Sequence, residues 1–382
     1  MNEVVCVGTA KEMGIAQGAA LSTNIYDALE AVGNLEAFRL MKPSYIPFPV
    51  FRRIAEYRAA RFLNAAFRST PLDAADRLQG ISEGAKIPYS KLAICSLLEV
   101  ALSDLDPLVT AGPNGLQAGC SAVAVTGNAS STGHPIIAHN FDYLPVVQPY
   151  YFVRRSRPKG KLRSVEFAVS PLAGAIDGVN EAGLAITCNY AYVTDPISPA
   201  PSITMLIAEA LACVRTVDEA YQFFANRKRA GGGLLMLSDE HGTIASFELS
   251  NTQIQKIAPL PGREITHHTN RIRGSKIASV ELEDQAHYKK NAPRALRGTR
   301  VHQSADMRSV DLQCRLDEKS VFDLETLHTV MSDHGDGPSQ DSVCMHSNYW
   351  NTTACVQLQS KERKLRASFS NACNAKFQEF DC

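Results

Sequence analysis

The chain has 382 residues, of which 45% are hydrophobic, and it carries 39 Lys plus Arg against 39 Asp plus Glu. A chain of this length can bury a large core. Zero formal net charge argues against nucleic acid or an anionic membrane as a partner. The short basic cluster at residues 154–161 is expected to be a solvated hairpin tip. There is no apolar run long enough to span a bilayer and no secretory leader, which favours a cytoplasmic protein.

The first 119 residues are predicted to be mostly helical. Residues 22–40, 47–67 and 73–83 repeat apolar side chains at the spacing of a helix. Residues 108–118 contain Pro113, Asn114 and two Gly, and Gly119 follows directly. That composition predicts an exposed loop, the kind of place where a chain is cut.

After residue 119 the pattern changes to short apolar runs joined by turn residues, which is typical of β-hairpins. Four hairpins are predicted, over residues 121–140, 174–190, 233–248 and 354–369, with a helical block at 202–225. Hairpins around a helical block predict antiparallel sheets covered by helices, an α+β fold. Residues 1–119 and 120–382 are expected to form one structural domain.

Gly119-Cys120 begins the first of these hairpins and offers unusual chemistry. A cut before Cys120 would give that residue a thiol and an α-amine together. An unperturbed α-amine titrates near pH 8 and can accept the thiol proton, which produces the far more reactive thiolate. Glycine at position 119 would permit a bent backbone with an uncovered carbonyl. Gly-Cys alone is more typical of a small core cysteine at a strand start.

Asp142 follows the strand that is expected to pair with the strand of Cys120. Its carboxylate could therefore lie close to the new amine, hold the ammonium and orient it. The same position in a sequence is also typical of an aspartate that caps a turn, and Asn140 could be a local turn former.

Four stretches, taken together, resemble the acyl-coenzyme A:6-aminopenicillanic acid acyltransferase group of N-terminal nucleophile hydrolases, peptidase family C45. They are residues 8–18 (GTAKEMGIAQG), Gly119-Cys120-Ser121 with Asn140-Phe141-Asp142, residues 178–184 (GVNEAGL) and residues 267–270 (HHTN). Residues 370–377 add a weaker match. The resemblance implies a four-layer αββα sandwich and self-cleavage at Gly119-Cys120, without a metal or a bound organic cofactor.

The resemblance also implies a role for each matching residue. Cys120 would be both the self-cleavage residue and the mature nucleophile, and Asp142 would hold the α-amine. Asn270 would donate a side-chain N–H to the oxyanion of the tetrahedral intermediate, and Asn189 is placed in the same oxyanion hole. Losing one such donor costs roughly a hundred- to a thousandfold in rate.

Three further residues, His139, Asn140 and Tyr143, are candidates for contact with the substrate. His139 departs from the choloylglycine-type relatives, which have arginine before Asn-x-Asp. Because a histidine can be neutral near pH 7, recognition of a substrate carboxylate does not transfer to this chain.

The function expected is that of an autoproteolytic cysteine amidohydrolase or acyltransferase. A small N-acyl amide or acyl thioester would form an acyl-enzyme on Cys120, and the two cleavage fragments would stay associated as a heterodimer. Hydrolysis and acyl transfer differ only in the second acceptor, so both stay open. Two alternatives are a papain-like Cys/His hydrolase without self-cleavage and a catalytically silent binding protein on the same scaffold.

The ten cysteines contain no CxxC pair and no common ligand spacing, so buried reduced thiols are the expectation. His267, His268 and His334 belong to no fixed-spacing set and are expected to be structural or surface residues. Cys344 and His346 are expected to be a core residue and a surface group. The sequence therefore predicts no metal site.

Overall fold

The larger of two sheets has eight strands. The computed structural model describes residues 2–97, 119–260 and 262–382, so the loop expected at 108–118 lies outside the described residues. The strands of the larger sheet are β1 (Asn2–Gly8), β4 (Tyr151–Pro158), β5 (Ser164–Val169), β6 (Asp177–Asn180), β7 (Ala185–Ala191), β8 (Gly232–Ser238), β9 (Ile244–Leu249) and β10 (Ile254–Ile257), in that spatial order. Only β1 and β4 are parallel neighbours among these strands; the other pairs are antiparallel.

The smaller sheet has six strands, all of them antiparallel to their neighbours. In spatial order they are β11 (Ile265–His268), β2 (Gly119–Val125), β3 (Ile136–Tyr143), β12 (Asn351–Gln359), β13 (Lys364–Ser368) and β14 (Gln378–Asp381). The β2–β3 hairpin lies in the interior of this sheet and carries Gly119-Cys120 at its open end.

The helices fall into three groups along the chain. The N-terminal group is α1 (Ala10–Ala20), α2 (Ser22–Gly33), α3 (Glu36–Leu40), α4 (Phe48–Ser69), α5 (Asp73–Ala85) and α6 (Tyr89–Ser96). The middle pair is α8 (Ile203–Cys213) and α9 (Val217–Ala225), and the last pair is α10 (Gln303–Asp317) and α11 (Leu324–Met331). Short 3-10 helices include η2 (Pro145–Tyr150) and η4 (Ala372–Asn374).

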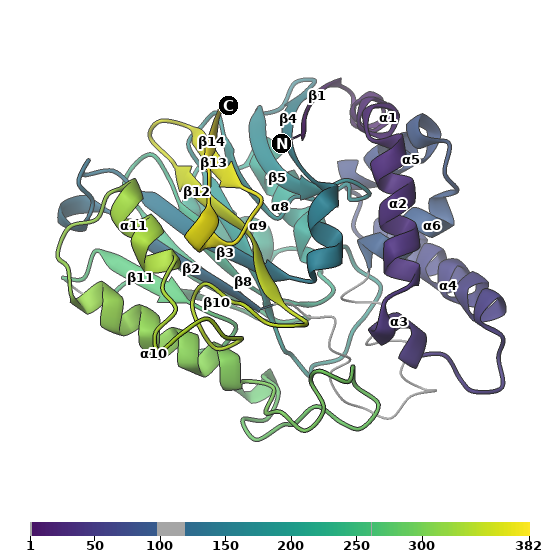
Figure 1. Cartoon of the computed structure of the whole chain (residues 1–382). Coiled ribbons are helices and arrows are strands. Elements are labelled where there is room, and N and C mark those ends of the chain that lie inside the picture. The colour runs from purple at the N-terminus through teal and green to yellow at the C-terminus, as the bar shows by residue number, and fades with distance from the viewer. Residues whose placement is uncertain (1, 98–118, 261) are drawn as a thin grey trace.

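The two sheets and the two later helix pairs form four layers. Side chains of both sheets share one apolar core, to which Ala122 and Ile137 contribute from the smaller sheet and Met236 from the larger. Helices α8 and α9 bury a second core against the outer face of the larger sheet. Helices α10 and α11 bury a third against the smaller sheet, and Figure 1 shows them opposite the N-terminal helices. The predicted αββα sandwich is confirmed.

The four predicted hairpins are present as β2–β3, β6–β7, β8–β9 and β12–β13. The turn of the second hairpin explains the 178–184 stretch in physical terms. The Asn180 side chain accepts hydrogen bonds from the Ala182 and Leu184 amides and donates to two carbonyls at the end of α8. Gly183 has a φ of +86°, a conformation that favours glycine.

The N-terminal region differs from the prediction at two points. The helix expected over residues 22–40 ends at Gly33 and restarts at Glu36 as α3. Strand β1 was not predicted, and it joins the larger sheet as a parallel neighbour of β4. A parallel pair of strands needs no turn between them, so the local turn signals of a hairpin are absent here.

The basic cluster at 154–161 is only partly a hairpin tip, and the prediction was wrong for Arg154. This residue lies within β4, is fully buried, and forms an ion pair with Glu166 of β5 at 2.5 Å. A buried charge needs a partner of opposite sign, and Glu166 supplies it from the neighbouring strand. Residues 159–163 alone form the connection between the two strands.

The glycine-rich stretch at residues 8–18 has a structural explanation. Thr9 and Glu12 form a capping box at the start of α1. A Cβ atom at Gly14 or Gly18 would lie within 2.1 or 2.4 Å of backbone oxygens in α5, so both positions require glycine. The close contact of α1 with α5 anchors the N-terminal helices, and Gln17 joins α1 to the sheet by donating to the Ser170 and Leu172 carbonyls.

Across the described residues, every helix is too short or too polar to traverse a lipid bilayer. No disulfide joins any of the ten cysteines, all of which lie in the described part of the chain. The expectation of buried thiols is confirmed for five of them, Cys6, Cys95, Cys120, Cys344 and Cys355; the others are exposed or half-buried.

Candidate active site

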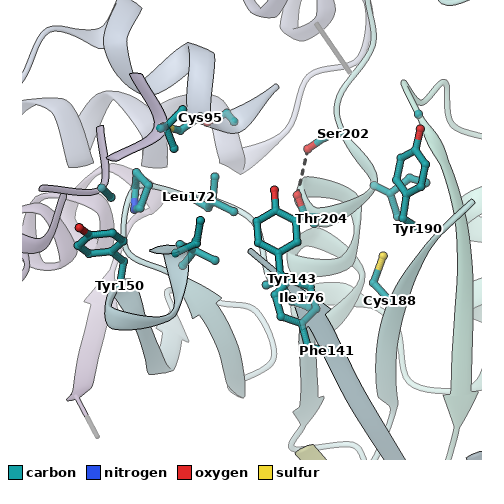
Figure 2. Close-up of a pocket in the computed structure, with 18 of the residues that line it drawn as sticks. Cys95, Phe141, Tyr143, Tyr150, Leu172, Ile176, Cys188, Tyr190, Ser202 and Thr204 are labelled. Carbon is teal, nitrogen blue, oxygen red and sulfur yellow. Dashed lines mark hydrogen bonds between the residues drawn. The ribbon is translucent and has the colours of Figure 1, made fainter. Parts of the chain in front are cut away.

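A cavity of about 110 Å³ lies where the N-terminal helices meet the two sheets, and the Cys120 side chain is part of its wall. Figure 2 shows aromatic and aliphatic side chains facing this space, with Cys188 and Tyr190 on one side and Tyr150 and Cys95 on the other. Its apolar wall is formed mainly by Val32, Phe141, Val147, Val169, Leu172 and Ile176. Such a cavity favours an apolar group of a small molecule.

Cys120 is only 1% exposed, so its thiol is reached through the cavity. Its backbone N–H donates to Oδ1 of Asn270 at 2.9 Å, and its carbonyl accepts from Nη1 of Arg308 at 2.5 Å. The backbone N–H of Asp142 acts on the thiol in the direction that lowers its pKa. The backbone N–H and carbonyl of this cysteine therefore both have partners within one buried cluster.

Gly119 stands directly opposite Asp142 in the register of β2 and β3. It is part of the extended strand, and its φ lies outside the positive region, so the bent backbone expected at this glycine is not found. The lack of room for a side chain explains the glycine at this position instead. An added Cβ would lie 2.9 Å from Cε of Met345 and 3.2 Å from Nη2 of Arg308.

Asp142 is fully buried beside this peptide bond. Its Oδ1 accepts a hydrogen bond from Oγ1 of Thr352 at 2.6 Å. Its Oδ2 accepts no hydrogen bond among the described residues and lies 3.7 Å from Nη1 of Arg308. Burial raises the pKa of this carboxyl to about 6, although Arg308 and Thr352 oppose the rise.

The electrostatics of Cys120 favour the neutral thiol in this uncut chain. Burial is the main cause that raises the pKa of the thiol well above its ordinary value, and the Asp142 carboxylate adds to it. The Asp142 amide and the Arg308 guanidinium act in the opposite direction but do not overcome burial. A base is therefore needed before this sulfur can attack a carbonyl.

Asn270 and Asn189 both lie at this cluster. Asn270 contacts the Cys120 amide through its oxygen, while its Nδ2 donates to the Tyr190 carbonyl at 2.8 Å. Asn189 is fully buried, and its Nδ2 donates to the carbonyl of Thr269, the neighbour of Asn270. The structure thus brings together Cys120, Asp142, Asn270 and Asn189; a role in an oxyanion hole stays a prediction for both asparagines.

Of the three residues proposed to contact substrate, only Tyr143 lines the cavity, where it stacks on Phe141 with ring centroids 5.3 Å apart. His139 is buried, and its Nδ1 lies 2.8 Å from Oδ2 of Asp177. Asn140 points to the other face of the sheet, where its Nδ2 donates to the Met331 and Val343 carbonyls. Neither His139 nor Asn140 is among the residues that form the cavity wall.

Two residues of the cluster, Arg308 and Thr352, were missed by the sequence analysis. Arg308 lies on α10 and also donates to Ser121 Oγ and Asn270 Oδ1, both at 2.8 Å. The buried stripe of α10 comprises Ala305, Arg308, Leu312 and Leu316. An arginine at a core position of an apolar helix stripe was the available signal, because such a charge must meet a buried partner.

Comparisons with known proteins gave similar solved structures and a family model. The structure is similar to a Caenorhabditis elegans ortholog of N-acylethanolamine-hydrolyzing acid amidase, with 12% identity, a TM-score of 0.45, and coverage of 63% of this chain and 93% of that one. It is also similar to penicillin V acylase from Agrobacterium tumefaciens, with 15% identity, a TM-score of 0.44, and coverage of 69% and 86%. A variant of conjugated bile acid hydrolase from Clostridium perfringens has 14% identity, a TM-score of 0.40, and coverage of 69% and 97%.

A search of curated proteins gave no match. A family model described as acyl-coenzyme A:6-aminopenicillanic acid acyl-transferase matches residues 128–367. The match includes Asp142, Asn189 and Asn270 and begins shortly after Cys120. Because it extends over more than half of the chain, the resemblance seen in the sequence is confirmed, and the chain belongs to this acyl-transferase family.

Proposed function

We propose that this chain is an N-terminal nucleophile amidohydrolase or acyltransferase that cuts itself before Cys120 and then uses the Cys120 thiol as its nucleophile. One observation carries the proposal. A thiol at the start of an interior strand opens into an apolar cavity, while the peptide bond before it lies across from Asp142 and donates its N–H to Asn270. Arg308 holds the Cys120 carbonyl, on the other side of the same residue.

The first step in this proposal needs a base, because the amine of Cys120 is still in a peptide bond. The charged groups that act most on the thiol are Asp142 and Arg308. Of the two, only a carboxylate accepts a proton near neutral pH. Asp142 would take the thiol proton, and the sulfur would then attack the Gly119 carbonyl carbon. As the Gly119–Cys120 C–N bond breaks, the nitrogen gains a proton and the sulfur retains the Gly119 acyl group as a thioester.

Addition of one water to that thioester would release the Gly119 carboxylate and restore the thiol. Cys120 would then carry a free α-amine. Its nitrogen is the amide nitrogen of the uncut chain, so it would lie within the same buried cluster. The Oδ1 atom of Asn270 already accepts from this nitrogen, and Oδ2 of Asp142 has capacity for an ammonium hydrogen. The amine is the base of the mature site, since its pKa lies near pH 8.

In the mature site, the thiolate would attack the carbonyl of an N-acyl amide or acyl thioester. The amine or thiol of the substrate leaves, and the acyl group stays on sulfur until water or a second amine accepts it. The apolar wall supports a substrate whose acyl part is apolar. The family's named activity, transfer of an acyl group, supports the same chemistry.

The proposal treats residues 1–119 and 120–382 as two fragments of one folded unit. Strand β1 pairs with β4 along its full length, and α1 holds Ser170 and Leu172 through Gln17. Both contacts join the first fragment to the second, which supports a stable heterodimer after the cut.

The test is an intact-mass measurement on purified protein, followed by a screen of small N-acyl amides and acyl thioesters with and without added amines. Two masses with the junction at Gly119-Cys120, together with turnover, would support the proposal. A single uncut chain that turns over substrate would favour a papain-like hydrolase, and an uncut inert chain would favour a binding protein. The ratio of acid to transferred product separates hydrolase from transferase.

The rate of self-cleavage is expected to increase with pH and to reach half of its maximum near pH 6. Burial raises the pKa of Asp142 to about 6; below that pH the carboxyl is protonated and cannot accept the thiol proton. A slow Cys120→Ser variant makes the rate measurable on gels across the pH range. Asp142→Asn in that background should be slow at every pH. An unchanged midpoint in this double variant would exclude Asp142 as the group that titrates.

The cavity is expected to select acyl chains by length. Each buried CH₂ contributes about 0.8 kcal/mol, so kcat/KM should increase about fourfold for each added CH₂ until the cavity is filled. Ile176→Trp reduces the space and should lower kcat/KM for long acyl chains while acetyl donors are little affected. Ile54→Trp, on the exposed face of α4, is the matched control. Equal losses for short and long donors would contradict this assignment of the acyl pocket.

A further inference from the structure

Four side chains outside the cavity bring their ligand atoms to one point. They are His334, Cys344, His346 and Cys373, and the ligand atoms all lie within 4.8 Å of one another. The Nε2 atom of His346 lies 3.1 Å from Nε2 of His334, 3.4 Å from Sγ of Cys344 and 3.5 Å from Sγ of Cys373. Cys344 is a core residue, as expected, but its Sγ also contacts His346, a half-buried residue that was expected at the surface.

These separations agree with the edges of a tetrahedron around one zinc ion. Zinc binds imidazole nitrogen at about 2.0–2.1 Å and thiolate sulfur at about 2.3 Å. A tetrahedron with those radii has N–N edges of about 3.4 Å and N–S edges of about 3.5 Å. The three distances around His346 lie close to these values without any rearrangement of the chain.

We propose that His334, Cys344, His346 and Cys373 form a structural Cys₂His₂ site for Zn²⁺. Two thiolates and two imidazoles are a closed zinc ligand set, and their softness disfavours Mg²⁺ and Ca²⁺, which prefer oxygen ligands. Four protein ligands leave no open position for a water, so the role is structural rather than catalytic.

The surrounding fold holds the ligands in place from two separate segments. His334, Cys344 and His346 lie in the connection between α11 and β12, and Cys373 is in η4. Within the connection, the Cys344 amide donates to the Asp333 carbonyl and the His346 amide to the Ser339 carbonyl. Cys373 is exposed and Cys344 is buried, so an ion could enter from solvent and be retained below the surface.

The zinc site would also stabilise the cluster around Cys120, through Met345 and Thr352. Met345, between two of the ligands, is the side chain that faces Gly119, and its backbone forms two hydrogen bonds with Thr352. Thr352 in turn donates to Asp142. A zinc ion would thus fix the segment on which the position of Asp142 depends. Zinc binding itself does not require that the chain cuts itself.

The alternative for these atoms is a disulfide between Cys344 and Cys373. It would use the two thiols but leave the convergence of both imidazoles on the same point unexplained. Zinc requires both sulfurs as thiolates, so its binding would release their protons.

The test is the metal content of the untagged full-length chain, measured by inductively coupled plasma mass spectrometry. One zinc ion per chain is expected. After removal of zinc, one equivalent of Co²⁺ should give the visible absorption of a tetrahedral site together with thiolate-to-cobalt charge transfer. Cys373→Ser and His334→Gln should lose the zinc and the cobalt spectrum, while Cys213→Ser and His134→Gln, at exposed positions elsewhere, should retain both.

Three results would overturn the proposal. The first is wild-type protein that contains no zinc and gives no tetrahedral spectrum with Co²⁺. The second is a Cys373→Ser variant that keeps full zinc content. The third is a Cys344–Cys373 disulfide in peptide maps of zinc-free protein from cells. Because the cobalt spectrum is measured on wild-type chain, the test holds even where a variant folds poorly.

Discussion

A Cys120→Ala variant is expected to remain one uncut chain and to lose turnover of every acyl donor. The substitution removes both the sulfur that attacks Gly119 and the sulfur that carries the acyl group. Loss of a catalytic nucleophile lowers kcat by roughly a million-fold in the best-measured cases. Intact-mass spectrometry gives the state of the chain, and product assays give the turnover. Cys120→Ser should cut slowly or partially and turn over poorly, because a hydroxyl is less acidic than a thiol.

The control for this variant is Cys355→Ala. Cys355 is also a fully buried strand cysteine of the smaller sheet, but its side chain contributes to the core under α10 and α11 and not to the cavity. Cys355→Ala should be cut and active, with a small loss in the free energy of unfolding of about 1 kcal/mol. Cleavage of Cys120→Ala at the same junction would contradict the proposal, because no other residue is assigned the attack.

Much of the layered fold could be predicted because its hairpins are local. Each of the four predicted hairpins consists of two short stretches that are apolar or that alternate apolar and polar residues. Turn residues such as Gly183 lie between the two stretches. Strand β1 was missed because its partner β4 lies far along the chain, and nothing near residues 2–8 marks that pairing. The αββα arrangement itself came from the family resemblance rather than from the pattern of any one segment.

The basic cluster at residues 154–161 shows that a run of charged residues does not reliably predict which of them are exposed. Five charged residues within 154–161 are typical of a solvated tip, but Arg154 is buried because Glu166 lies across the hairpin from it. Ion pairs across a sheet depend on register, which the sequence does not display. A single arginine can therefore be in the core while its neighbours are exposed.

Residues of the candidate site were predicted only where they lie in a sequence motif. Cys120, Asp142 and Asn270 belong to stretches that resemble the family, and the structure brings them into one buried cluster. Thr352 and Arg308 reach the cluster from segments more than 150 residues away from Cys120 in the chain. Only the fold brings such residues together, and the same holds for the four proposed zinc ligands, whose spacing matches no known pattern.

Arg308→Met is expected to slow self-cleavage at neutral pH by about tenfold for each unit by which the pKa of Asp142 rises above 7. The guanidinium donates to the Cys120 carbonyl and to Asn270, and it is the main group that opposes the rise in the pKa of Asp142. Without it, the pKa of Asp142 rises further, so the pH at half-maximal cleavage should move above about 6. Removal of one partner of a buried ion pair also costs about 3 to 5 kcal/mol of stability.

Lost stability alone could slow cleavage, so Arg154→Met is the matched control. Arg154 is an equally buried arginine that pairs with Glu166. Arg154→Met should lower the melting temperature by about as much as Arg308→Met does, and it should leave the pH midpoint of cleavage unchanged. Arg308→Lys keeps the charge near Asp142 but loses the planar fork that reaches several acceptors, so its midpoint should lie between those of wild type and Arg308→Met. If Arg308→Met and Arg154→Met share the wild-type midpoint, Arg308 stabilises the fold without tuning Asp142.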